Sequence, residues 1–165
     1  MYLTLFIIYS IFGWILEVIC NSVIQNQFVN NHFLLIPLCP MYGFAGILIF
    51  YFSKNIKNYF SIFIISIIIS ILVEYFTSYC LELIFNIRWW DYSKKIANLH
   101  GRINLINTIE FGLLGTIGVY FSRKLVSWLN NYKLSLVNIF IISILIVDTT
   151  ISSYYTYNIS KNNTN

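Results

Sequence analysis

Five long apolar stretches occupy most of this chain, and they dictate the solvent in which it can fold. They cover Tyr2 to Val23, Pro37 to Ser53, Tyr59 to Phe85, Ile103 to Ser122, and Leu134 to Tyr157. A helix needs about 20 mostly apolar residues to cross a bilayer. With 58% hydrophobic and 10% charged residues, a 165-residue chain could not bury this surface in a soluble domain. The sequence predicts an all-α, polytopic transmembrane helical bundle of about five spans, forming one integral membrane domain over residues 1–165.

Two parts of the sequence resemble each other. Trp14, Leu16, Glu17, Ile19 and Asn21 reappear in order and spacing as Tyr79, Leu81, Glu82, Ile84 and Asn86. A second pattern, Gly43, Gly46 and Tyr51 to Lys54, returns as Gly112, Gly115 and Tyr120 to Arg123. Chance matches are common in a chain rich in Ile, Phe and Tyr. We nevertheless predict repeats over 2–58 and 59–125 and an extra helix over 134–157, with a site between the halves.

Orientation follows from the ends of the apolar stretches. The first stretch lacks a basic leader and a small-residue cleavage site, so we expect it to remain as a helix. Basic residues are evenly divided between the two sides, but Lys54 and Arg123 each directly follow a Tyr-Phe-Ser sequence. An aromatic residue beside a cation is typical of a cytoplasmic anchor. The sequence predicts a multi-pass protein of the cell membrane with a cytoplasmic N-terminus.

All six acidic residues lie in or near apolar stretches: Glu17, Glu74, Glu82, Asp91, Glu110 and Asp148. A central acid costs on the order of 3 kcal/mol for insertion, so these residues should face protein and not lipid. Glu74, Ser78 and Glu82 are spaced for one stripe of the third helix. Similar stripes are predicted for Ser10, Gly13, Glu17 and Asn21, and for Asp148 and Ser152 with Tyr155 beside them. Gly43, Gly46, Gly112, Gly115 and Gly118 favour close helix packing.

The loop between the third and fourth stretches carries the most chemistry. It reads Arg88-Trp89-Trp90-Asp91-Tyr92-Ser93 and continues through Lys94 and Lys95 to His100-Gly101-Arg102. An arginine is the natural partner for Glu17 or Glu82 at a helix end, and the tryptophans are typical interfacial anchors. His32, His100, Glu17 and Glu82 are acceptable metal-ligand types, but no spacing favours a site. We expect no metal and no cofactor, and we interpret Cys20, Cys39 and Cys80 as small packing residues.

Two prolines, Pro37 and Pro40, flank the start of the second stretch, and the helix is expected to begin near Met41. The segment from Asn30 to Cys39 is therefore a candidate for irregular backbone inside the membrane. Such backbone requires cover from protein or from a wet cavity.

Several strings of this sequence resemble a known family. They are Asn31-His32-Phe33-Leu34 running to Pro37, then Pro40-Met41-Tyr42-Gly43, Arg88-x-Trp90-Asp91-Tyr92-Ser93, and Asn98-x-x-Gly101-Arg102-Ile103. From Ser10 to Gly115 the chain resembles the putative ABC-transporter type IV family, the CmpB-like integral membrane proteins of bacteria. Ile36 and the run Glu110-Phe111-Gly112 depart from the family pattern. The resemblance implies a membrane location and a permease.

Two classes of function remain open. One is a permease or substrate-binding membrane subunit for a small solute, alone or as a homo-oligomer, with a separate ATP-binding subunit because this chain has no phosphate-binding loop. The other is an intramembrane enzyme or an accessory factor of envelope or lipid metabolism. No catalytic motif supports a reaction, so we favour a non-enzyme. The net charge of +4 is scattered, which gives no sign of nucleic-acid binding. The candidates for solute binding or ion pairing are Glu17, Glu74, Glu82, Arg88, Asp91, His100, Arg102 and Glu110.

Overall fold

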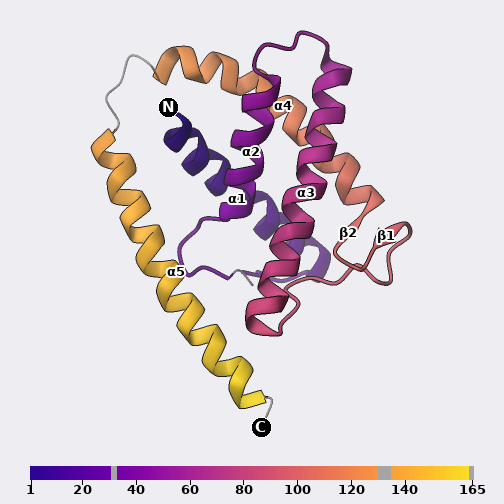
Figure 1. Ribbon diagram of the computed structural model, residues 1–165, viewed down its shortest axis with the longest axis vertical. Helices are drawn as coiled ribbons and strands as arrows, with labels where there is room; N and C mark the ends of the chain where they lie inside the picture. The colour runs from indigo at the N-terminus through magenta and orange to yellow at the C-terminus, as the bar shows by residue number, and fades with distance from the viewer. Residues whose placement is uncertain (31–32, 130–134, 164–165) are drawn as a thin grey trace. The chain divides into compact units, whose positions relative to one another are not determined.

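The computed structural model describes residues 1–30, 33–129 and 135–163. These residues form the helices α1 (Tyr2–Gln25), α2 (Pro40–Ser53), α3 (Tyr59–Phe85), α4 (Leu105–Leu129) and α5 (Ser135–Asn163). A two-stranded antiparallel ladder, β1 (Asn98–Leu99) with β2 (Ile103–Asn104), lies between α3 and α4 (Figure 1). The predicted all-α class is confirmed. Within the described residues, α1, α3, α4 and α5 are long and apolar enough to cross a membrane, and α2 is a shorter apolar helix.

The helix ends differ from the predicted stretches where polar residues continue a helix. The third stretch matches α3 at both ends, and α2 begins at Pro40, one residue before the expected start near Met41. The helix α4 runs to Leu129 and α5 to Asn163, beyond the predicted Ser122 and Tyr157. Helical hydrogen bonding does not stop where hydrophobicity stops, because a polar turn can extend past the hydrocarbon into the headgroup region.

The chain folds into two compact units, one of residues 1–43 and 131–165 and one of residues 44–130. In the first unit, glycines bring α1 and the start of α2 together. A side chain at Gly13 would overlap the ring of Tyr42, and one at Gly43 would overlap Phe6 and Ser10. The helices α1 and α5 also meet, where the amide of Asn138 donates to the hydroxyl of Thr4 at 2.7 Å.

In the second unit, α3 and α4 pack along each other. A side chain at Gly112 would overlap Phe63 and Ile67, and one at Gly115 would overlap Ser66. The apolar core here consists of Ile49, Ile62, Ile69 and Val119. The predicted packing role of these two glycines is confirmed.

The end of α2 is tied to α4 by Arg123. Its guanidinium donates to the carbonyl oxygen of Ser53 at 2.7 Å and also to that of Ile56. Carbonyls at a helix C-terminus lack helical partners, and an arginine satisfies them well. Arg123 therefore holds the α2–α3 turn in addition to its expected place at a membrane boundary.

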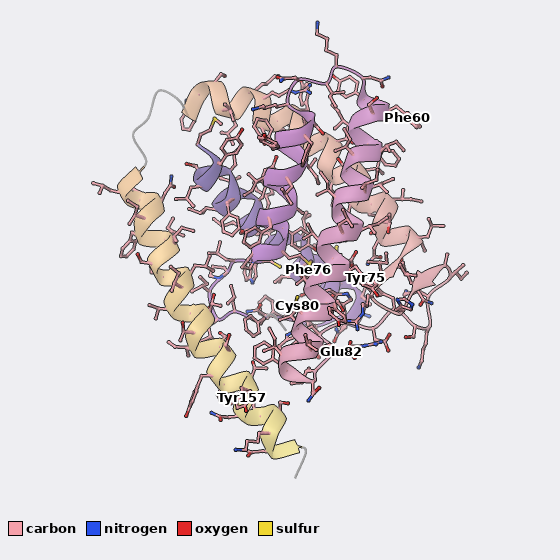
Figure 2. The ribbon with its side chains drawn as sticks, viewed as in Figure 1. Phe60, Tyr75, Phe76, Cys80, Glu82 and Tyr157 are labelled. Carbon is pink, nitrogen blue, oxygen red and sulfur yellow. The ribbon has the colours of Figure 1, made fainter. Side chains whose placement is uncertain are left out.

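The stripes predicted from the sequence are largely buried. Glu74 and Ser78 of α3, Ser10 and Gly13 of α1, and Asp148 and Ser152 of α5 are buried. Tyr155 is an exception, because it is 68% exposed and points away from the buried face of α5. Large apolar side chains such as Phe60 and Phe76 are exposed along α3 (Figure 2). This distribution, polar inside and apolar outside, is the one a bilayer requires.

Candidate functional site

Four charged side chains meet where α3 ends. We call Glu82, Arg88, Asp91 and Arg102 the Glu82 cluster. The carboxylate oxygen Oε2 of Glu82 accepts from Nε of Arg88 at 3.1 Å and from Nη2 of Arg102 at 2.5 Å. The Nη1 atom of Arg88 lies 3.8 Å from Oδ1 of Asp91. Of the two glutamates that the sequence offered as arginine partners, Glu82 pairs with both loop arginines.

The cluster forms because α3 stops abruptly. Asn86 adopts the left-handed conformation with φ of 52°, and its N–H donates to the carbonyl of Glu82 at 2.8 Å. Asparagine tolerates this conformation better than most residues, so it ends the helix and turns the chain back. Glu82 is thereby left in the last turn, and Arg88 follows two residues after the cap. A cation at this position is also favoured by the negative end of the helix dipole.

Arg102 is the buried member of the cluster, with 8% of its surface exposed. Its Nη1 atom donates to Oγ of Ser78 at 3.0 Å. The guanidinium also lies over the rings of Tyr75 and Tyr79, at 5.7 Å and 5.4 Å from their centroids. A guanidinium held by a carboxylate, a hydroxyl and two aromatic faces has little freedom to move. Arg102 is therefore a fixed charge between α3 and the loop.

Asp91 organises the loop through its neighbour Ser93. Its Oδ1 atom accepts from the hydroxyl of Ser93 at 2.5 Å and from the backbone N–H of Ser93 at 2.9 Å. These two hydrogen bonds, with smaller contributions from Arg88 and Lys94, hold the pKa of the Asp91 carboxyl below its ordinary value of 3.8. Asp91 is consequently charged at neutral pH.

Gly101 makes room for this arrangement. It has φ of +67°, which favours glycine, and a Cβ there would overlap the Asp91 carboxylate and the Ser93 hydroxyl. The backbone of Gly101 also accepts from the N–H of Tyr92 at 2.7 Å. Glycine is thus required for two reasons, the backbone conformation and the close approach of Asp91.

His100 and Trp90 also form hydrogen bonds with members of the cluster. The imidazole of His100 hydrogen-bonds the hydroxyl of Tyr75 at 2.8 Å, and its carbonyl accepts from Nη1 of Arg88 at 3.4 Å. The indole of Trp90 donates to the carbonyl of Arg102 at 2.9 Å. Figure 2 shows Tyr75 and Glu82 on the flank of α3 next to the loop that carries β1 and β2. Trp90 therefore supports the loop, in addition to any role as an interfacial anchor.

The structure brings together five of the eight candidate residues: Glu82, Arg88, Asp91, His100 and Arg102. All five come from the second predicted repeat or the loop within it. Glu110 is exposed on α4. Glu74 is buried, with 3% of its surface exposed, two turns before Glu82 on the same stripe. Whether any of these residues binds a solute remains a prediction.

Glu17 lies in the other unit. The thiol of Cys39 donates to its carboxylate with Sγ and Oε2 3.7 Å apart. Among the described residues, no three His, Cys, Asp or Glu side chains lie close enough to hold a metal ion. The proposed ligand His32 falls outside the part of the chain that the structure describes.

Sequence reasoning missed Tyr75 as a partner of Arg102 and His100. A signal was present, because Tyr75, Ser78, Tyr79 and Glu82 have the spacing of one helix face. It also left Asp148 out of the candidates, although this carboxylate accepts from the backbone N–H of Leu35 at 3.0 Å. No local pattern could show that contact, because the two residues are 113 positions apart.

Long apolar helices with apolar side chains on their exposed surfaces define a class, the multi-pass α-helical membrane proteins. Comparison with known families is more specific. The family model described as putative ABC-transporter type IV matches residues 4–153, and the chain belongs to this family. No curated protein and no solved structure matches the chain.

Proposed function

We propose that this protein is the membrane subunit of a transporter for a small solute, and that a solute group with negative charge binds at the Glu82 cluster. Family membership and the apolar helices support the transporter class. The observation that carries the site is the partial exposure of Glu82 and Arg88, whose side chains are 33% and 35% exposed beside the buried Arg102. Charges held this way at the end of apolar helices are costly and are typical of solute pathways.

The two arginines have different parts in this proposal. Arg102 is fixed by Ser78, Tyr75 and Tyr79, so it positions Glu82 and does not exchange partners. Arg88 can exchange, since its contact with Asp91 at 3.8 Å is long and its side chain is partly exposed. A carboxylate or phosphate of a solute would take the place of Asp91 at Arg88.

Asp91 can release Arg88 at low cost. Both hydrogen bonds from Ser93 remain when the arginine turns to a solute, so the carboxylate keeps its donors. The cluster as it stands has two acids and two arginines and is neutral. An incoming anion therefore adds a negative charge next to Asp91, whose side chain is 54% exposed, so water can screen the Asp91 carboxylate when Arg88 leaves it.

The energy source in this proposal is a separate ATP-binding subunit, as the family description suggests. The sequence contains no G-x-x-x-x-G-K-[ST] phosphate-binding loop, so hydrolysis would have to occur on another chain. The proposal includes both this ATP-binding subunit and the assembly of the membrane protein as a homo-oligomer.

The test begins with the tagged protein purified from its own host in a mild detergent, followed by mass spectrometry. A stoichiometric ATP-binding subunit is expected. A protein that emerges alone, or with envelope enzymes and a bound lipid, would overturn the transporter proposal and favour a role in envelope metabolism.

A variant pair then tests the site within the purified assembly. Arg88→Gln should abolish solute-stimulated ATP hydrolysis while the subunits stay together. Lys94→Gln is the matched control, because Lys94 is an exposed cation of the same loop outside the cluster. Equal activity of the two variants would exclude Arg88 as a solute contact.

A further inference from the structure

The second apolar stretch begins as irregular backbone and only then becomes a helix. Residues 33–39 lie outside any helix, and α2 starts at Pro40. The N–H of Leu35 donates to Oδ2 of Asp148 at 3.0 Å, and the N–H of Cys39 donates to the carbonyl of Ser10 at 3.0 Å. Both acceptors lie inside long helices. The irregular segment is therefore held against the interior of α1 and α5, and Figure 1 shows it passing beside α5.

The position of Asp148 along α5 indicates how deep in the membrane its contact with Leu35 lies. The bond between Thr4 and Asn138 joins the early turns of α1 and α5, so the two helices start at the same end. Asp148 lies near the middle of α5 (Ser135–Asn163), far from both ends. If α5 crosses the membrane, Asp148 is close to the bilayer midplane. The irregular segment reaches the same depth.

A carboxylate at this depth requires a positive partner. Asp148 is 6% exposed, and its hydrogen bond comes from one neutral N–H. Within residues 1–30, 33–129 and 135–163, no lysine, arginine or histidine forms an ion pair with it. Burying an unpaired charge is so costly that a cation bound beside this carboxylate would stabilise it strongly.

A second, independent feature points to a ligand at the same place. Ser152 follows Asp148 by one helical turn and lies on the same face of α5. It is 5% exposed, and its hydroxyl oxygen has no hydrogen-bond partner among the described residues. Other hydroxyls of α5 instead bond to their own helix, as those of Ser143, Thr149 and Thr150 do. A buried hydroxyl left unpaired is expensive, so Ser152 is suited to a ligand.

We propose that Asp148 and Ser152, with backbone carbonyls of the segment 33–39, bind a sodium ion. All the donors are oxygen atoms, one of them on a carboxylate, which suits a hard cation. Irregular backbone beside a span also leaves carbonyls outside the helical hydrogen-bond ladder, where they can coordinate an ion. This site lies in a different unit from the Glu82 cluster, and the proposal does not depend on the solute site.

The test is a sodium titration of the full-length protein in mild detergent. Thermal unfolding is followed by tryptophan fluorescence in NaCl and in choline chloride at equal ionic strength. A ligand that binds only the folded state raises the unfolding midpoint as its concentration rises. We expect a saturable increase with sodium that choline does not reproduce. The absence of any sodium-specific increase in the wild-type protein would overturn the proposal.

Three variants locate the effect. Asp148→Asn keeps an oxygen acceptor for the Leu35 amide but removes the charge, so the sodium response should disappear. Ser152→Ala should raise the half-saturating sodium concentration by about tenfold or more, a typical scale for weakening a metal site. Thr149→Ala is the matched control and should respond as wild type, because Thr149 is exposed and bonds only its own helix.

If Asp148→Asn does not accumulate, the half-saturating sodium concentrations of Ser152→Ala and Thr149→Ala still test whether sodium binds at Ser152. An identical response of these two, or an unchanged response in Asp148→Asn, would show that sodium acts elsewhere.

Discussion

At the scale of single residues, the groups that stabilise each acidic side chain differ from one acid to the next. Glu82 has two arginines, Asp91 has the two donors of Ser93, and Asp148 has one backbone amide. The sequence identified each of these acids as costly. It could not distinguish them, since the cost is offset by atoms that come from other parts of the chain.

The lowered pKa of Asp91 leads to a prediction about acid stability. The pKa of Asp91 is lower in the folded protein than in the unfolded chain, so its charged form stabilises the fold at pH values above the unfolded pKa. This contribution is lost as the pH falls through the folded pKa. The loop 88–102 should therefore stay protected from amide hydrogen exchange at neutral pH and lose protection as the pH falls below the ordinary value of 3.8.

The comparison is with Asp91→Asn, measured by hydrogen exchange and mass spectrometry in the same detergent. That variant should lack this acid transition and should be less protected at neutral pH, because it removes the charged acceptor from Ser93. A transition of the same size in the variant would assign it to another group.

At the scale of elements, the α3–α4 pair depends on close backbone approach. Gly112 lies against Phe63 and Ile67, so a larger residue has no space without moving a ring or the helix. Membrane helices lack a strong hydrophobic drive to associate and rely on such contacts.

We predict that Gly112→Val lowers the free energy of unfolding by about 1–3 kcal/mol, the usual range for overpacking. The thermal midpoint in detergent is the measurement. Leu113→Val is the control on the next residue of α4; Leu113 is 54% exposed, so its substitution should have little effect. Equal midpoints for the two variants would mean that α4 does not pack through Gly112.

At the scale of the whole molecule, the number of crossings decides the topology. Among the described helices, four are long enough to span, whereas the 14 residues of α2 reach only about 21 Å at 1.5 Å per residue. If the irregular residues 33–39 complete the second crossing, the chain crosses five times. The two termini then lie on opposite sides.

This gives a prediction for reporter fusions. With a cytoplasmic N-terminus, alkaline phosphatase fused after Lys161 should be active, and a green fluorescent protein at the same place should be dark. The same reporters fused after Lys54 should behave in the opposite way, which provides an internal control. A fluorescent C-terminal fusion would show an even number of crossings and would exclude a second crossing by residues 33–53.

The sequence by itself determined the solvent, the helical class and the family resemblance, because hydrophobic run length and local motifs are properties of neighbouring residues. It also suggested an arginine as the partner of Glu17 or Glu82 without deciding between the two. Only the tertiary structure decided that Arg102 is the buried partner, that Glu110 is exposed and that Asp148 receives the Leu35 amide. These outcomes depend on contacts between distant parts of the chain, and neither periodicity nor composition encodes which buried charge meets which donor.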